Sequence, residues 1–255
     1  MNTRRIASGL IAAALLLATG FAGAADHPIV PHEAEYRVKI SVLRGLLLTR
    51  VEEFATGYRA QSEIVPKGFA SVLKNGSISE RSDFVLKPDG IRPLHYESHD
   101  TLSKNEKLMR FDFDWSDDFI EGRINDERFR FDMNGAVQDR VSIQYELMHQ
   151  LLHGEAVTDY AMLDGDEIKQ LAVSNIGTRK VDVPFGRFEA VGIQHSAKDS
   201  SRVTTLWCVR ELGYLPVIIE QHRDGKLKVR AELQDYRPIA SGDREPVVDA
   251  LPGME

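Results

Sequence analysis

The sequence has few of the features that mark several large classes of protein. It contains a single cysteine, Cys208, so the chain cannot form an internal disulfide. It has no run of lysine and arginine, and its formal net charge is −7, which argues against a nucleic-acid surface. Dinucleotide, phosphate-loop, nucleophile-elbow and HExxH motifs are also missing. These absences argue against nucleic-acid binding and against several common classes of enzyme, and no cofactor is expected.

Long apolar runs are rare, and the clearest one lies at the N-terminus. Arg4 and Arg5 precede an apolar run over residues 6–17, and small residues that signal peptidases accept end at Ala24. The run is shorter than the ~18 apolar residues of a membrane span, and no later run approaches that length. Residues 1–24 are therefore predicted to be a signal peptide cleaved near Ala24. The mature chain is expected in a bacterial periplasm, without an integral membrane segment.

The remaining chain is long enough to bury a sizeable core. We expect a single β-rich domain over residues 25–237, although two smaller domains would also satisfy the length. Residues 238–255 are rich in proline and glycine, acidic and without hydrophobic periodicity. They are predicted to form a disordered acidic tail.

Alternation of apolar and polar residues dominates the domain. It is clearest over residues 33–42 and 107–115, and turn residues recur at roughly ten-residue spacing, as in an all-β protein. The pattern predicts a mainly β fold, an antiparallel meander forming a barrel or strongly curved sheet. The pattern alone leaves a two-sheet sandwich possible.

Three strands are predicted within residues 203–233. The last alternates Leu227, Val229, Ala231 and Leu233 with charged residues. A two-residue Asp224-Gly225 turn would set apolar residues opposite charged ones. A three-residue loop over residues 223–225 would instead pair Val217 with Ala231 and Ile219 with Val229, so the hydrophobic pattern favours the longer loop.

One helix is predicted, over residues 137–153. Its apolar residues recur at spacings of three and four, with Asn134 as a candidate N-cap and Gly154 as a stop. The apolar arc is expected to pack at an opening or on one face of the sheet. Gln144 lies inside the arc, so it should be hydrogen-bonded in the core or face a cavity.

Two groups of residues have the types and spacing of metal ligands. His95, Glu97 and His99 share one face of a predicted strand, opposite Leu94 and Tyr96, which are expected to be buried. The second group shares one face of the predicted helix, opposite its apolar arc. Both groups also fit ordinary solvent-facing surfaces, which is the favoured interpretation. The second group is Glu146, His149 and His153.

Two further features have ordinary structural explanations. Four aspartates cluster near a turn, but their spacing lacks the EF-hand pattern, so solubility and edge protection explain them better than a calcium site. Cys208 lies in a strand-like run and is expected to be a small buried apolar residue rather than a reactive thiol. The aspartates are Asp112, Asp114, Asp117 and Asp118.

Several short segments together resemble a known family. The chain resembles a family of exported bacterial proteins defined by a domain of unknown function, number 3108, from about Glu33 to Tyr236. The resemblance supports the compartment and the fold and implies no catalytic residues. The segments are Ala34-Glu35-Tyr36, Ile91-Arg92-Pro93-Leu94 with Tyr96, Phe111-Asp112-Phe113-Asp114-Trp115, Asp139-Arg140-Val141-Ser142, Val183-Pro184-Phe185-Gly186-Arg187-Phe188-Glu189-Ala190, and Leu206-Trp207 leading to Leu212-Gly213-Tyr214-Leu215-Pro216-Val217.

The favoured function is a non-enzymatic periplasmic binding or carrier protein. A concave sheet covered by an amphipathic helix could hold an apolar ligand or an envelope component. One alternative is a metal-dependent envelope hydrolase that uses the histidine groups. Another is a structural interaction module that works through a sheet edge. Candidate ligand-binding residues are Trp115, Tyr145, Met148, Trp207 and Tyr214, each of which would serve equally well as core.

Overall fold

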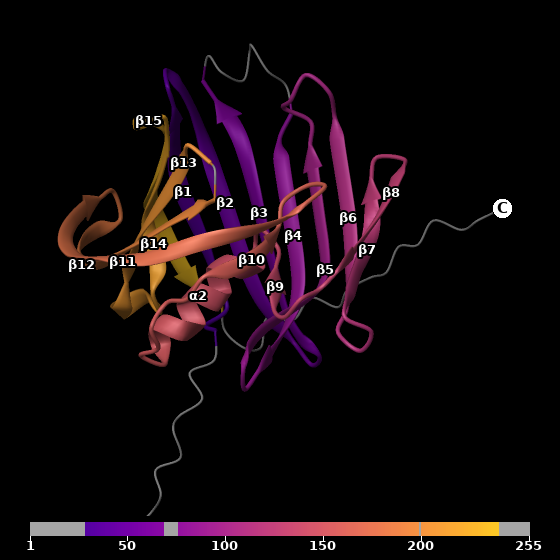
Figure 1. Ribbon diagram of the computed structural model, residues 1–255. Helices are drawn as coiled ribbons and strands as arrows, with labels where there is room; N and C mark the ends of the chain where they lie inside the picture. The colour runs from indigo at the N-terminus through magenta and orange to yellow at the C-terminus, as the bar shows by residue number, and fades with distance from the viewer. Residues whose placement is uncertain (1–28, 69–75, 199, 240–255) are drawn as a thin grey trace, which may run out of the picture.

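The computed structural model describes residues 29–68, 76–198 and 200–239 (Figure 1). The predicted signal peptide and nearly all of the predicted acidic tail lie outside these residues. The limits of the domain therefore stay predictions.

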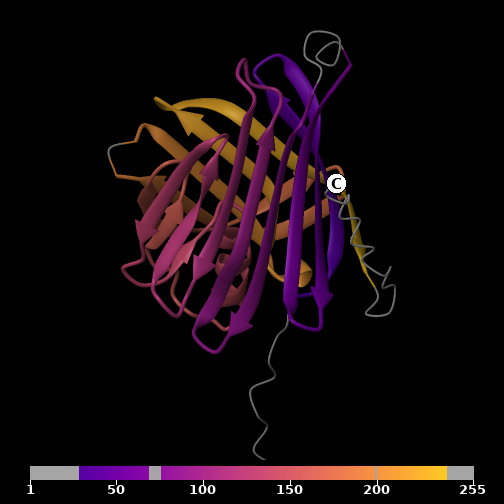
Figure 2. The same cartoon turned by 90° about the vertical axis from the view of Figure 1, so that its right-hand side faces the viewer.

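The first half of the domain is a β-meander. Each strand pairs with the next in antiparallel fashion, and the eight strands form one half of the sheet (Figure 2). Turn residues explain the tight connections, because Asp118 and Asn125 take the positive φ angles that short hairpins require. The strands are β1 (His32–Ile40), β2 (Leu43–Phe54), β3 (Gly57–Lys67), β4 (Ile78–Lys87), β5 (Gly90–Asp100), β6 (Lys107–Asp114), β7 (Phe119–Ile124) and β8 (Glu127–Asp132).

The second half contains a helix and seven more strands. A 3₁₀ turn, Arg210–Leu212, joins the strands β13 and β14. The parallel pair β9–β10 is the exception in an otherwise antiparallel sheet. The elements are β9 (Val137–Gln138), α2 (Ser142–Leu152), β10 (Tyr160–Leu163), β11 (Ile168–Val183), β12 (Gly186–Ala197), β13 (Arg202–Val209), β14 (Leu215–Arg223) and β15 (Lys226–Pro238).

All fifteen described strands form one sheet that is not closed. Its order is β8-β7-β6-β5-β4-β3-β2-β1-β15-β14-β13-β12-β11-β10-β9. The two halves join where β1 pairs with β15, from His32 opposite Pro238 to Ile40 opposite Val229. The prediction of a barrel or strongly curved antiparallel sheet is confirmed, in its open form.

The β14–β15 hairpin differs from the prediction. Arg223 pairs with Lys226, so Asp224 and Gly225 form a two-residue turn, and both have positive φ angles. A β-bulge between Gln221 and His222 then shifts the register, so that Ile219 lies opposite the apolar Ala231. The predicted three-residue loop is therefore wrong, although a two-residue turn alone would indeed set apolar residues opposite charged ones. The bulge also leaves Leu227, which was expected to be buried, 48% exposed.

Helix α2 is shorter than predicted at its start. Residues 137–138 instead form β9, and Asp139, not Asn134, caps the first turn: its Oδ1 accepts N–H bonds from Val141 and Ser142. The end was predicted correctly. Gly154 has φ +69° and, with the next residue, closes a Schellman-type cap on the last turn.

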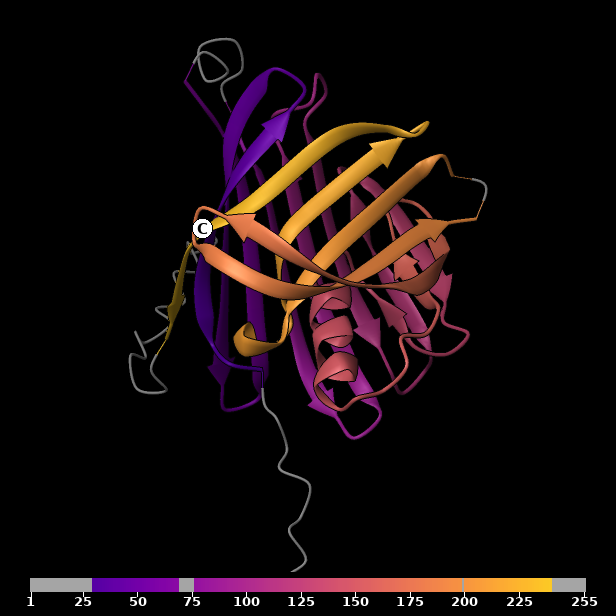
Figure 3. The ribbon, with the colours of Figure 1, turned by 90° about the vertical axis from the view of Figure 1, so that its left-hand side faces the viewer.

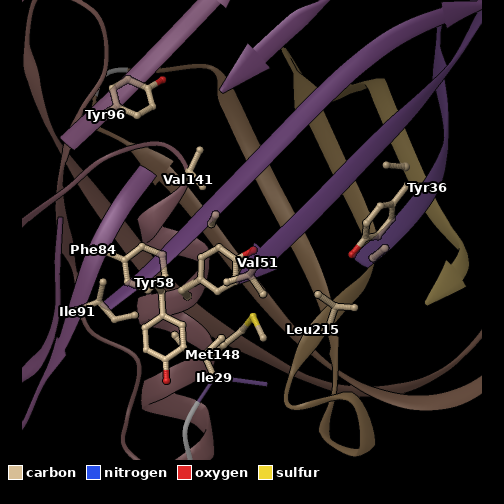
Figure 4. Packing of buried hydrophobic residues seen from close by; sticks show 14 of the residues in the cluster. Ile29, Tyr36, Val51, Tyr58, Phe84, Ile91, Tyr96, Val141, Met148 and Leu215 are labelled. Carbon is tan, nitrogen blue, oxygen red and sulfur yellow. The ribbon is translucent and has the colours of Figure 1, made fainter. Parts of the chain in front are cut away.

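The core lies between the two halves of the sheet, where α2 also lies (Figures 1 and 3). Tyr58, Phe84 and Met148 come from β3, β4 and α2 and lie together in it (Figure 4). On the other side Tyr36 donates its hydroxyl hydrogen bond to the Pro216 carbonyl at 2.9 Å, which ties β1 to β14. The helix is thus packed on the sheet, as predicted.

Candidate functional site

A cleft of about 660 Å³ lies between α2 and a wall built from β10 to β14. This volume is within the range of about 300–1,000 Å³ that small-molecule sites occupy. The helix contributes Ile143, Gln144 and Leu147. The wall contributes most of the remaining lining: Tyr160, Met162, Asp164, Lys169, Leu171, Val173, Ile193, His195, Arg202, Thr204, Leu206, Ile219, Gln221 and Arg223.

Strand register arranges the wall into three rows of different polarity. Ile193, Leu206 and Ile219 are cross-strand neighbours and form an apolar row. A polar row lies two residues away from the apolar row on each strand. A cationic pair lies two residues beyond the polar row, in the same direction. Because every second residue of a strand faces the same side, all three rows face the cleft. The polar row is His195, Thr204 and Gln221, with the apolar Val173 beside His195 at its end, and the cationic pair is Arg202 and Arg223.

The helix covers the apolar row. Leu147 packs in one buried cluster with Ile193, Leu206 and Cys208. Gln144, one turn before Leu147, faces the cleft, and its amide lies 4.0 Å from the Met148 sulfur. The expectation that Gln144 is hydrogen-bonded in the core or faces a cavity is therefore confirmed in its second form. The predicted burial of Cys208 is also confirmed.

Two of the cleft's cations are already neutralised. Lys169 Nζ lies 2.6 Å from Asp164 Oδ2, and Arg140 lies 3.2 Å from Glu80 and 4.0 Å from Asp164. Burial of Asp164 opposes ionisation, but the hydrogen bond from Lys169 and the nearby positive charges outweigh it and lower the pKa of this carboxyl. These ion pairs lie at the same end of the cleft as Arg202, whose positive charge also helps to lower the Asp164 pKa.

The middle of the wall is polar but uncharged. Burial lowers the pKa of His195 to about 4, so its imidazole is neutral at neutral pH. Thr204 lies beside it on β13 and Gln221 follows on β14. These groups can exchange hydrogen bonds with a ligand without adding charge.

A buried polar anchor holds the start of α2 against the sheet. The Asp139 carboxylate accepts hydrogen bonds from the Val141 and Ser142 backbone at 2.7 and 2.8 Å, and from the Ser82 hydroxyl on β4 at 2.5 Å. The Ser142 hydroxyl in turn accepts a bond from the Asp139 N–H. Complete burial raises the pKa of Asp139 to about 6, although these bonds favour its ionised form.

The predicted solvent-facing group on the helix is buried instead. Glu146 is 6% and His149 7% exposed, whereas His153 at the helix end is exposed. Glu146 accepts hydrogen bonds from the Ile91 N–H at 2.6 Å and from Gln150 at 2.8 Å. The prediction failed because α2 contacts β5 on one side and the β10–β14 wall on the other, so its polar face is not free for water.

The strand trio contacts residues of β6 and the loop before it rather than one another. His95 lies 2.8 Å from Asp112, His99 2.6 Å from Glu106, and Glu97 3.2 Å from Arg110. Leu94, expected to be buried on the other face, is 41% exposed, because it is the extra residue of a β-bulge in β5, opposite Asp83 and Phe84 of β4. Tyr96 is buried as expected.

The remaining candidates do not converge on a site. Within residues 29–68, 76–198 and 200–239, no three His, Cys, Asp or Glu side chains are placed to hold a metal ion. In the aspartate cluster, Asp114 accepts hydrogen bonds from Ser116 and Asp117 and shapes the turn. No helix of the described part of the chain is both long and apolar enough to cross a membrane.

None of the five predicted ligand-binding residues is among those that line the cleft. Tyr145 and Met148 are buried in the core. The Trp207 ring is covered by the Arg179 guanidinium at 3.7 Å. The Trp115 indole donates to the Pro93 carbonyl at 2.6 Å, and Tyr214 packs against the core. Sequence reasoning favoured large aromatics, whereas the cleft is lined by residues whose common face depends on strand register.

The chain belongs to the family described as "Protein of unknown function (DUF3108)", whose model matches residues 34–232. The fold is similar to a beta-barrel-like protein of the domain of unknown function DUF1849 from Brucella abortus. That similarity has a TM-score of 0.57 and 13% identity, and it covers 83% of this chain and 99% of that one. A weaker likeness, to an exported protein with a YmcC-like fold from Bacteroides fragilis, has a TM-score of 0.33, 12% identity, and covers 81% and 95%. No curated protein matches the sequence.

Proposed function

We propose that this member of the DUF3108 family is an exported, non-enzymatic binding protein that holds an apolar or amphipathic ligand in the cleft beneath α2. The observation that carries the proposal is the cleft itself. It combines an apolar row of Ile193, Leu206 and Ile219 with a few polar side chains, which is the usual composition of a small-molecule site.

Export is supported by the sequence. The predicted signal peptide, with Arg4, Arg5 and small residues up to Ala24, directs a chain across the bacterial inner membrane. In an aqueous compartment, burying an apolar molecule in a protein is favourable by a free energy roughly proportional to the apolar surface removed from water. A cleft partly covered by a helix provides such burial.

Filling the cleft is expected to weaken binding of a neutral apolar probe, N-phenyl-1-naphthylamine, at least about tenfold, or ~1.4 kcal/mol. The variant is Thr204→Trp, because Thr204 lies in the middle of the wall and a large ring there occupies the ligand's space. Fluorescence titration measures the dissociation constant.

The matched control is Val203→Trp. Val203 is the neighbouring residue of β13, and its side chain lies on the opposite face of the strand from Thr204. This variant should bind the probe like the wild-type protein. Equal affinity in the two variants, or no binding by the wild-type protein, would overturn the proposed site.

A further inference from the structure

Two arginines face each other across neighbouring strands at one end of the cleft. Arg202 of β13 pairs directly with Arg223 of β14, and both line the cleft. Like charges directly opposite each other destabilise a sheet. Among the described residues, neither side chain takes part in an ion pair within 4.0 Å, in contrast to Arg140 and Lys169 at the same end of the cleft.

The cleft concentrates positive charge in an acidic protein. Its lining includes four cationic side chains and one carboxylate, although the chain carries a formal net charge of −7. Asp164 already accompanies Lys169 and Arg140. An anion between Arg202 and Arg223 would relieve their repulsion and would accept their forked N–H donors, which suit carboxylate and phosphate.

Polarity changes in one direction along the wall. Starting from the arginine pair, the polar row with His195 comes next, and the apolar row with Leu206 lies beyond it under Leu147. The rows are roughly 6–7 Å apart, since each lies two residues further along the strands. A molecule lying along this gradient would have a charged end and an apolar end.

Resting on the proposed function, we infer that the cleft's ligand is a single-chain amphiphile with an anionic headgroup. The headgroup, a carboxylate or a phosphate monoester, binds Arg202 and Arg223. The chain passes the neutral polar row and ends on the apolar row beneath α2. The two arginines therefore determine both the selectivity and the orientation of the ligand.

Competition between ligands with the same twelve-carbon chain tests this inference. Dodecanoate, dodecyl phosphate, 1-dodecanol and dodecyltrimethylammonium would each displace N-phenyl-1-naphthylamine from the mature protein, below their micellar concentrations. We expect at least one of the two anions to bind tenfold or more tightly than the alcohol, and the cation to bind most weakly. Whichever anion prevails identifies the headgroup.

Charge reversal should invert this order. The variant R202E/R223E is expected to lose the preference for anions and to bind the cation best. R123E/R128E makes the same change in net charge at an exposed cross-strand arginine pair of β7 and β8, outside the cleft, and should keep the wild-type order. R202Q/R223Q, which only removes the repelling charges, should fold and bind all four ligands with similar affinity. This variant tests the role of the two arginines if R202E/R223E does not fold.

The outcomes separate the two proposals. Equal binding of dodecanoate, dodecyl phosphate and dodecanol by a wild-type protein that still binds the neutral probe would overturn the anionic headgroup and leave the proposed function standing. A preference for anions that survives in R202Q/R223Q would equally overturn the role of the two arginines. No binding of the neutral probe would overturn the proposed function and the inference with it.

Discussion

Replacing Phe84 with alanine is expected to lower the free energy of unfolding by about 3–5 kcal/mol. Phe84 is 1% exposed, and its ring stacks between Tyr58 of β3, with centroids 5.6 Å apart, and Tyr145 of α2, at 5.4 Å. Removing the ring leaves a cavity at the point where the meander meets the helix. The loss should therefore lie at the upper end of the range for buried aromatic residues.

Urea denaturation followed by circular dichroism measures this change. Leu227→Ala is the control, because Leu227 is a large apolar residue that the hairpin bulge leaves exposed. Its effect should stay within about 0.5 kcal/mol. A loss below about 1 kcal/mol for Phe84→Ala would mean that the helix does not pack on β3 and β4 as described.

Replacing Asp139 with alanine is expected to cost about 2–4 kcal/mol. Loss of a helix cap contributes about 1 kcal/mol. The Ser82 hydroxyl, which donates to the carboxylate in a fully buried site, would lose its partner, which typically costs about 1–3 kcal/mol. Asp139→Asn keeps an acceptor for the Val141 and Ser142 N–H groups and should cost much less. Equal losses in the two variants, again by urea denaturation, would contradict the cap.

Asp139 should also make stability depend on pH. Its pKa is raised from 3.8 to about 6 in the folded protein, mainly by burial. A carboxyl with a raised pKa stabilises the fold most below its unfolded pKa, and this contribution is lost as pH rises through the folded value. Two pKa units correspond to ~3 kcal/mol. The stability of the wild-type protein relative to Asp139→Asn should thus fall by up to ~3 kcal/mol between pH 4 and pH 7.

The comparison with Asp139→Asn is needed because other carboxyls act in the opposite direction. Burial disfavours the ionised forms of Asp83 and Asp164, but their arginine and lysine partners outweigh it and lower their pKa values, so they lose stabilising charge in acid. Both groups remain in the variant, so their contributions cancel in the difference. A difference that is constant across this pH range would show that Asp139 titrates normally.

Local patterns predicted strands such as β1 and β6 well because one face of each lies in the core. The alternation in β1 and β6 is reproduced by buried Tyr36, Val38, Phe111 and Phe113. The hairpin shows where this reasoning stops. The pattern shows that a two-residue turn at Asp224-Gly225 would pair apolar with charged residues. A longer loop and a β-bulge both restore apolar pairing, and the sequence does not distinguish them. The structure uses the bulge.

The site could not be predicted for a related reason. Arg202 and Arg223 are 21 positions apart, and only the register of β13 and β14 makes them neighbours. The polar face of the helix was wrongly predicted to face solvent. A helical wheel places Glu146 on the solvent side, but its carboxylate accepts a hydrogen bond from the buried Ile91 N–H. Gln144 was the one correct signal, since a polar residue within an apolar arc does face the cleft.

The location of a bound ligand tests the central claim most directly. A crystal of the mature protein grown with 12-bromododecanoate would show the bromine by its anomalous scattering. We predict one bromine beside Leu147 and Leu206, with the carboxylate between Arg202 and Arg223. Bromine at another surface, or a chain lying in the cleft with its carboxylate at the Leu147 end, would contradict the account.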